Sequence, residues 1–203
     1  MKPRLYIDQK ITAFVNKYKI YGVDPATAAK GGLIGLAQQK RIAFKEKVSF
    51  FADEQKTQLA FTFRAEKVLD VHGRYFVEDT NGNLVGMFKK EFAESLVVST
   101  WKVMSPDGTV LFEVAESNVT LAILRRFAGW IPVVGDIVEL ITLFFRYHFV
   151  FKDVATGEIV GTYKKLTLFR DHYELAMTDE AAAKCDWRTL AAFGVGLDAL
   201  QSR

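Results

Sequence analysis

RYFVEDTNGNLVGMFKK at residues 74–90 and HFVFKDVATGEIVGTYKK at residues 148–165 are two versions of one pattern. Each begins with an aromatic-rich run, continues through a turn that contains Asp and Gly, and ends with Val-Gly-x-aromatic-Lys-Lys. Alternating polarity indicates strands, and Asp and Gly are favoured in hairpin turns. The pattern therefore predicts a β-hairpin that the chain uses twice, with Asn81–Gly82 as a two-residue turn in the first copy. A weaker third copy spans residues 101–116.

The same alternation recurs along most of the chain, from RLYID at residues 4–8 to RDHYELAMT at residues 170–178. We count about twelve strands that follow one another as hairpins, which is typical of a barrel or a sandwich. A meander of this length leaves exposed edge strands unless it closes on itself. The sequence therefore predicts a mainly β protein, a closed antiparallel barrel of about twelve strands, as a single domain over residues 1–203.

Two segments break the β pattern. Residues 118–146 are predominantly apolar and predict a pair of short helices inserted between two strands of the barrel. Residues 180–201 predict a hydrophobic C-terminal helix that is rich in Ala and Gly. Glycine costs about 1 kcal/mol relative to alanine inside a helix. Gly194 and Gly196 therefore indicate closely packed surroundings.

The strand meander and the small-residue C-terminal helix resemble the Tubby C-terminal-like superfamily. The shared hairpin ending G-x-[LI]-V-G-x-[FY]-K-K resembles its LURP-one-related and phospholipid-scramblase-like branch. The resemblance implies that the C-terminal helix lies in the barrel lumen and that the barrel faces phospholipid or a protein partner. Scramblases also carry a proline-rich N-terminal region, a cysteine cluster and an acidic calcium-binding segment. This chain has four prolines and one cysteine, and no loop of the acidic EF-hand kind.

Charge and hydropathy argue against a nucleic-acid partner and against a membrane-spanning segment. A net charge of +3 over 203 residues supplies too little positive charge for nucleic-acid binding. The N-terminus has no apolar signal region, and no uncharged stretch approaches the roughly 18–20 residues that cross a bilayer. We therefore expect a cytoplasmic protein that is soluble or peripheral to a membrane.

Catalysis and metal binding find no support in the residue pattern. The three histidines lack metal-ligand spacing, and no nucleophile elbow, phosphate loop or dinucleotide fingerprint occurs. Asp79, Asp107 and Asp153 each precede a turn glycine, which favours turn formation over a shared metal site. We predict a protein that is not an enzyme, with no catalytic residue, no metal site and no cofactor.

The two lysine pairs, Lys89–Lys90 and Lys164–Lys165, are candidate lipid-binding residues. Successive strand residues face opposite sides, so the two lysines of one pair do not share a flat patch. If the neighbouring aromatic residues face the lumen, the second lysine either marks a bulge or extends to the barrel mouth. The alternative to lipid binding is a role in solubility and in protecting strand edges.

The inserted segment supplies the other lipid-binding candidates. Arg125 and Arg126 are followed by Phe127 and Trp130, and cations beside interfacial aromatic residues are typical of an in-plane membrane element. The same apolar face is also suited to a lid over the barrel or to a dimer contact. Our leading hypothesis is a non-catalytic barrel that associates with an anionic phospholipid membrane surface. The alternative is a protein-interaction module that forms a homo-oligomer through the insertion and has no affinity for lipid.

Overall fold

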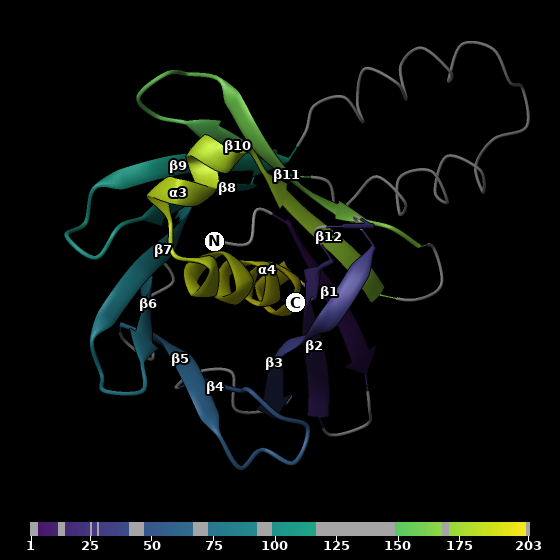
Figure 1. The fold of residues 1–203 in the computed structure, drawn as a ribbon. Coiled ribbons are helices and arrows are strands. Elements are labelled where there is room, and N and C mark those ends of the chain that lie inside the picture. Colours follow the sequence, from purple (N-terminus) through teal and green to yellow (C-terminus); the bar gives the residue numbers. More distant parts are fainter. Residues whose placement is uncertain are drawn as a thin grey trace, which may run out of the picture.

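The described strands form one closed antiparallel barrel, in the order β1-β12-β11-β10-β9-β8-β7-β6-β5-β4-β3-β2 (Figure 1). The computed structural model describes residues 4–11, 15–24, 26–27, 29–40, 47–66, 73–92, 99–116, 149–167 and 171–201. The strands are β1 (Arg4–Ile11), β2 (Val15–Val23), β3 (Lys30–Lys40), β4 (Val48–Phe51), β5 (Leu59–Ala65), β6 (Arg74–Asp79), β7 (Leu84–Phe92), β8 (Ser99–Met104), β9 (Val110–Glu116), β10 (Phe149–Asp153), β11 (Ile159–Lys165) and β12 (Asp171–Met177). Two helices follow, α3 (Asp179–Lys184) and α4 (Trp187–Gln201). The predicted barrel is confirmed.

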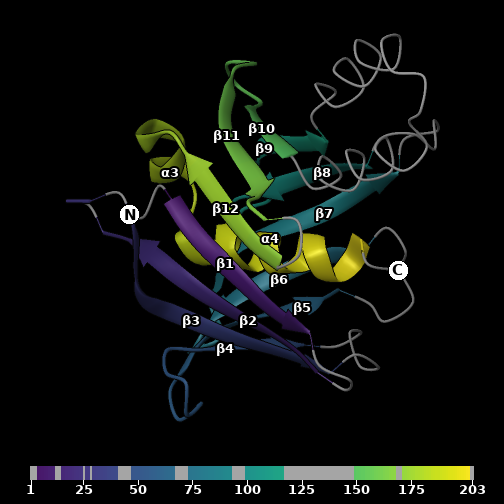
Figure 2. The same ribbon diagram turned by 90° about the vertical axis from the view of Figure 1, so that its right-hand side faces the viewer.

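The barrel has two different ends (Figure 2). At one end, which we call the turn end, short connections join β2 to β3, β4 to β5, β6 to β7, β8 to β9 and β10 to β11. The opposite end, which we call the loop end, carries the connections from β1, β3, β5, β7, β9 and β11 to the strands that follow them. The chain leaves β12 at the turn end, forms α3 there, and returns through the barrel as α4 towards the loop end.

The first copy of the repeated hairpin is β6–β7. Four residues, 80–83, separate the two strands, so the connection is longer than the predicted two-residue turn. The strand register shifts between Val77 and Glu78 before the turn, and Gly82 adopts a φ of 83° within it. A loop that contains a left-handed residue commonly brings a bulge with it, and a bulge increases strand twist. This local geometry suits a strongly curved barrel wall.

The other two copies of the hairpin show the same combination of a register shift and a glycine with a positive φ. The second copy, β10–β11, has a register shift between Phe151 and Lys152 and a φ of 74° at Gly157. The third copy, β8–β9, has a shift next to Met104 and a φ of 90° at Gly108. The repeated sequence is therefore a repeated bulged hairpin of one barrel.

The core is the barrel lumen, and α4 fills it (Figure 1). Leu190, Phe193 and Val195 have no exposed surface. The Phe193 ring lies 5.6 Å from that of Phe88 on β7 and 5.6 Å from that of Phe151 on β10, each measured between ring centroids. Complete burial of one such side chain stabilises the fold by about 1.5–3 kcal/mol.

The glycines of α4 lie where the helix approaches the barrel wall. A Cβ atom at Gly194 would come within 3.2 Å of Cε2 of Tyr163, and one at Gly196 would come within 3.0 Å of Cε2 of Phe88. The Tyr163 hydroxyl also donates a 3.1 Å hydrogen bond to the carbonyl oxygen of Gly194. These contacts confirm the close packing that the sequence predicts.

The predicted single helix over residues 180–201 is interrupted. Helix α3 ends at Lys184, and Asp186 then begins a new helix, because its Oδ1 accepts a 2.8 Å hydrogen bond from the backbone N–H of Arg188. An aspartate in this position satisfies an otherwise unpaired N–H of the first helical turn. The break changes the chain direction, so that α4 enters the lumen while α3 stays at the turn end.

Candidate functional site: the loop end of the barrel

The second lysine of each pair faces the lumen. Lys90 lies on the same face of its strand as buried Phe88, and Lys165 lies on the same face as buried Tyr163. The pairing of these strands with β8 and β12 continues past both lysines without a register shift. Of the two alternatives, a bulge or extension to the barrel mouth, these two pairings contain no bulge, and both side chains lie at the loop-end mouth.

Both inward lysines lie over aromatic rings. The Nζ atom of Lys90 is 5.7 Å from the ring centroid of Trp101, and that of Lys165 is 6.0 Å from the ring centroid of Tyr173. Lys165 also forms a 2.7 Å ion pair with Asp171, and its side chain is only 13% exposed. Helix α4 ends at this mouth and carries no basic residue in its last turn. Cations placed near a helix C-terminus are favourable, so the wall supplies the charge that the helix lacks.

The first lysine of each pair faces outward, as the alternation requires. Lys89 forms a 2.8 Å ion pair with Glu91, and Lys102 approaches the same oxygen of Glu91 at 3.1 Å. The hydrogen bond from Lys89 is the main reason why the pKa of Glu91 lies below its usual range. Lys164 is exposed and forms no ion pair within the part of the chain that the structure describes. Of the four predicted lysines, Lys164 has the most accessible charge.

Two further lysines at the loop end escape the sequence analysis. Lys10 on β1 and Lys17 on β2 are direct partners in the strand register, and both are exposed. Their positions could be found from sequence only by pairing the two strands about the short connection between them, since the turn fixes a hairpin's register. The two ammonium groups therefore share one patch of the outer wall.

Charge is distributed unevenly along the barrel axis. Cations of the described residues outnumber carboxylates at the loop end, and the reverse holds at the turn end. Among residues whose side chains the structure describes, the loop-end cations are Lys10, Lys17, Lys47, Arg74, Lys89, Lys90, Lys102, Lys164 and Lys165, and the carboxylates are Glu66, Glu91 and Asp171; Lys40 and Glu116 add one charge of each sign at the ends of β3 and β9. The turn-end carboxylates are Asp24, Asp53, Glu54, Asp79, Asp107, Asp153, Glu158, Asp179, Glu180 and Asp186, and the cations there are Arg4, Lys30, Lys56, Lys152, Lys184 and Arg188. The barrel consequently has a positive loop end and a negative turn end.

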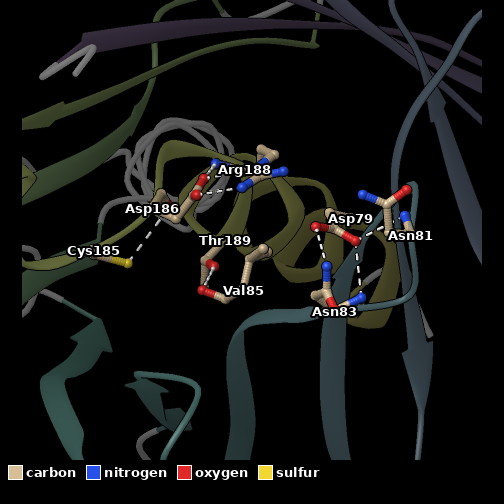
Figure 3. Close-up of polar contacts among 8 residues, drawn as sticks. All are labelled: Asp79, Asn81, Asn83, Val85, Cys185, Asp186, Arg188 and Thr189. Atoms are coloured by element: carbon tan, nitrogen blue, oxygen red, sulfur yellow. Dashed lines mark hydrogen bonds and ion pairs between the residues drawn. The ribbon is translucent and has the colours of Figure 1, made fainter.

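The turn aspartates account for much of the negative charge, and their role is structural. Oδ1 of Asp79 accepts hydrogen bonds from the backbone N–H groups of Asn81 and Asn83, both at 2.8 Å (Figure 3). Asp107 accepts in the same way from Thr109 at 3.2 Å. Bonds from the side chain and backbone of Asn83 hold the pKa of Asp79 below its usual range. The prediction that these residues form turns is confirmed.

The third turn aspartate, Asp153, also holds α3 in place. Its Oδ1 accepts a 2.9 Å hydrogen bond from the N–H of Ala155, and its Oδ2 forms a 2.5 Å ion pair with Lys184. Asp153 thus pairs with a lysine, whereas a shared metal site would bring it together with other acidic residues. Within the described part of the chain, no three His, Cys, Asp or Glu residues are placed to hold a metal ion.

The entrance of α4 into the lumen is also fixed by polar contacts (Figure 3). Asp186 accepts hydrogen bonds from Nε and Nη2 of Arg188 at 3.0 and 2.7 Å. The Thr189 hydroxyl donates a 3.4 Å bond to the carbonyl oxygen of Val85 on β7. These groups are engaged in positioning the helix, so the loop end is the better candidate for contact with a partner.

The remaining predicted site residues, Arg125, Arg126, Phe127 and Trp130, lie outside the described residues, as does the whole predicted insertion at 118–146. The strands on either side of this segment are described. Strand β9 ends at Glu116 and β10 begins at Phe149, both at the loop end. The segment therefore leaves and rejoins the barrel at its positive end.

The comparisons with known proteins agree with this architecture. The family model described as LURP-one-related matches residues 35–182, from within β3 to within α3, which is most of the chain. No curated protein and no solved structure gave a match. None of the helices formed by the described residues is both long enough and apolar enough to cross a membrane. The chain belongs to the LURP-one-related family, which is part of the Tubby-like C-terminal superfamily.

Proposed function

We propose that this protein is a non-catalytic barrel that associates peripherally with anionic phospholipid membranes and approaches them with its loop end. The observation that carries the proposal is the uneven charge along the barrel axis, positive at the loop end and negative at the turn end. An anionic surface attracts the first and repels the second, so it orients the barrel before contact. Each Lys or Arg near such a surface contributes about 1 kcal/mol.

The segment between β9 and β10 supports the same orientation through its sequence. Arg125 and Arg126 precede Phe127 and Trp130, so cations and interfacial aromatic residues lie in the connection that leaves the barrel at its positive end. Aromatic side chains are favoured at the membrane interface and cations at the level of the headgroups. The proposed membrane contact combines this segment with the exposed lysines of the loop end.

Co-sedimentation with vesicles tests the proposal. We expect binding to vesicles that contain phosphatidylserine, weak binding to neutral phosphatidylcholine vesicles, and progressive release as salt rises, since the Debye length falls from about 10 Å at 0.1 M to about 3 Å at 1 M. Replacement of Arg125 and Arg126 by Gln should weaken binding with little change in melting temperature. No binding of the unmodified protein, or binding that salt does not weaken, would contradict the proposal.

A matched pair of single substitutions tests the orientation. Lys164 and Lys152 are both exposed and both lie on the β10–β11 hairpin, but Lys164 is at the loop end and Lys152 is near the turn end. Each substitution by Gln removes one positive charge from the same element. Lys164→Gln should weaken vesicle binding about threefold to fivefold, from the roughly 1 kcal/mol per cation, whereas Lys152→Gln should leave it unchanged. Equal effects would contradict the orientation.

One observation favours the alternative of a protein-interaction module. Val154 and Ile159 flank the β10–β11 turn and are 48% and 65% exposed, which is high for large aliphatic side chains. Two such residues expose far less area than a stable interface buries. The homo-oligomer through residues 118–146 stays a prediction, and sedimentation velocity over a concentration series would test it.

A further inference from the structure

The first half of β3 has a backbone edge that pairs with no described strand. Strand β3 has eleven residues, whereas β4, its neighbour on that side, has only four. The register between the two strands involves only positions 36–38 of β3. On its other side β3 pairs with β2 along its whole length, from Lys30 to Lys40. Within the described part of the chain, residues 30–35 are therefore paired on one side only. We call their other side the open edge.

The chain that follows β4 does not extend along this edge, because it closes on itself. The N–H of Ala52 donates a 2.8 Å hydrogen bond to the carbonyl oxygen of Gln58, and Oδ2 of Asp53 accepts a 2.7 Å bond from the N–H of Gln58. Oε1 of Glu54 lies 2.7 Å from Nζ of Lys19, on the outer wall of β2. The β4–β5 connection thus engages its polar groups within itself and on the outer wall, and it leaves the open edge without a partner strand.

Strand β3 bends where it leaves β4. The register with β2 pairs Ile20 with Gly35 and Val23 with Lys30. Over this interval β2 advances by three positions and β3 by five, so β3 carries two extra residues. Extra residues of this kind bend a strand and increase its twist. The bend begins directly beyond Leu36, where the pairing with β4 ends, and this is why the two strands part.

The open edge lacks the groups that ordinarily protect an edge strand. Lysine, proline and inward-pointing charges are the usual protection against pairing with another chain. Residues 30–35, KGGLIG, contain no proline and no carboxylate. Their one lysine, Lys30, is held on the opposite side of the strand, where Nζ contacts Oδ2 of Asp8 and lies 3.7 Å from the ring centroid of Tyr21. The N–H and C=O groups of the open edge are therefore accessible to an added strand.

The surroundings of the open edge define the chemistry of its partner. Gly32 is exposed, and a Cβ atom there would meet nothing within 4 Å, so a bulky side chain of an opposing strand has room beside it. The two connections that flank the edge carry Asp24 and Asp53, and neither forms an ion pair with a cation of the described residues. A hydrogen bond from the backbone N–H of Thr57 is the main reason why the pKa of Asp53 lies below its usual range. The edge therefore suits an extended segment with aliphatic side chains and basic ends.

We propose that the open edge binds an extended segment of a partner protein by β-strand addition, with aliphatic side chains beside Gly32 and Lys or Arg residues beside Asp24 and Asp53. In this mode of recognition main-chain hydrogen bonds supply the affinity and side chains supply the specificity. Six residues span about 20 Å, which accommodates a short strand. The open edge lies at the turn end and the proposed membrane contact at the loop end, so the inference does not depend on membrane association.

Binding of synthetic peptides tests the open edge. The probe is a capped peptide of sequence KVTVTVK, and the matched peptide EVTVTVE reverses both terminal charges. In ¹H–¹⁵N spectra of the full-length protein, KVTVTVK should cause saturable shifts centred on residues 30–35. We expect it to bind about tenfold more tightly than EVTVTVE, from two exposed charge pairs. A KVTVTVK peptide that is N-methylated at every internal residue lacks the backbone donors and should not bind. Binding of the methylated peptide, or no saturable shift with KVTVTVK, would overturn the proposal.

A lysine placed on the edge supplies the matched variants. Gly32→Lys adds a side chain where the Cβ atom has room, and Asn81→Lys adds the same charge to the exposed β6–β7 turn at the same end of the barrel. Gly32→Lys should weaken binding of KVTVTVK about tenfold, because a lysine protects an edge strand and repels the basic peptide. Asn81→Lys should change it by less than about twofold, and both melting temperatures should stay within about 2 °C of the unmodified protein. Equal effects on binding would contradict the location.

Two further measurements separate this inference from its alternatives. If the signals of residues 30–35 shift as the protein concentration rises without peptide, a second copy of the chain covers the edge and the proposed partner is wrong. Co-sedimentation of Gly32→Lys with phosphatidylserine vesicles should match that of the unmodified protein. If the unmodified protein binds no vesicles but binds KVTVTVK at residues 30–35, the membrane function fails and the open edge stands. Vesicle binding without peptide binding gives the reverse result.

Discussion

Nδ1 of His172 on the last strand lies 2.7 Å from Oδ1 of Asp8 on the first strand, and the two residues are direct partners in the register that closes the barrel. Oδ2 of Asp8 also contacts Lys30 at the start of β3, so one carboxylate joins β12, β1 and β3. We call this β1–β12 pairing the seam. Arg4 and Glu174 form a 3.1 Å ion pair across it. The closure of the barrel therefore combines backbone pairing with a small charge network.

The seam predicts a dependence of stability on pH. Burial alone would raise the pKa of Asp8, but hydrogen bonds from Lys30 and His172 outweigh it and hold that pKa below its usual range. The stabilisation is therefore present above the ordinary value of 3.8 and is lost as the pH falls through the folded-state pKa. We expect Asp8→Asn to lower the melting temperature by about 2–4 °C at pH 7, for a loss of about 1 kcal/mol.

Thermal melts across pH check this expectation. The difference in melting temperature between Asp8→Asn and the unmodified protein should shrink as the pH falls below about 4, where the unmodified carboxyl also becomes protonated. Glu113→Gln is a suitable control, because Glu113 is exposed on the outer wall of β9. A difference for Asp8→Asn that stays constant from pH 7 to pH 3 would contradict the ionic role of the seam.

A second prediction concerns the contact between α4 and β7. A Cβ atom at Gly86 would lie 2.8 Å from Cγ2 and 3.0 Å from Cβ of Thr189, closer than side chains ordinarily approach. Gly86→Ala should therefore destabilise the fold by about 1–3 kcal/mol through overpacking. Adding Thr189→Ala removes the clashing Cγ2 and hydroxyl and should recover most of the loss. Urea unfolding of both single variants and the double variant measures the coupling, and strictly additive effects would contradict the contact.

The lysine pairs predict an asymmetry in stability. Lys165 is 13% exposed and paired with Asp171, whereas Lys164 is exposed on the opposite face of the same strand. Lys165→Gln leaves Asp171 without its cation in a largely enclosed place and should lower the melting temperature by several degrees. Lys164→Gln should leave it within about 1 °C. Equal melting temperatures for the two variants would show that the inward lysine is not held at the barrel mouth.

Cys185 provides a probe of the native packing. Burial raises the pKa of its thiol to about 12. The thiolate, which is the reactive form, is therefore scarce at pH 8, and alkylation by iodoacetamide should be slow in the native state and rapid in urea. The raised pKa also means that unfolding becomes easier as the pH rises above the ordinary value of 9.0, where the unfolded thiol ionises. Mass spectrometry measures the extent of labelling, and rapid native labelling at pH 8 would contradict this burial.

Much of the fold is predictable because it depends on short-range patterns. Alternating polarity gives the strands, and the turn glycines, such as Gly82 with its φ of 83°, show where they reverse. The glycines of α4 indicate a helix in a confined space, because glycine is unfavourable inside a helix and Gly194 is therefore best explained by close packing. Each of these signals lies within a few residues of the feature that it specifies.

The candidate site is less predictable because it depends on register between strands. The sequence singles out Lys89 and Lys90 by their repetition but does not show that Glu91 engages Lys89. Lys10 and Lys17 belong to no repeated motif, and their significance appears only once β1 and β2 are aligned. The helix break before Asp186 is similarly hard to predict, because an aspartate inside an Ala-rich run is equally compatible with a solvent-facing helical residue.

The helix inside the lumen has a consequence for synthesis. The ribosome makes β1 first, but Asp8 precedes its seam partner His172 by 164 residues, and α4 follows later still. At roughly 5–20 residues per second, the lumen-facing aromatic side chains wait about 10–30 s for the helix that covers them. During translation the emerging hairpins therefore expose both an open strand edge and an apolar face, which are the features that holdase chaperones recognise. Closure of the barrel is thus expected to follow the release of residue 201 from the exit tunnel, as one late step in which the last strand, the first strand and the central helix come together.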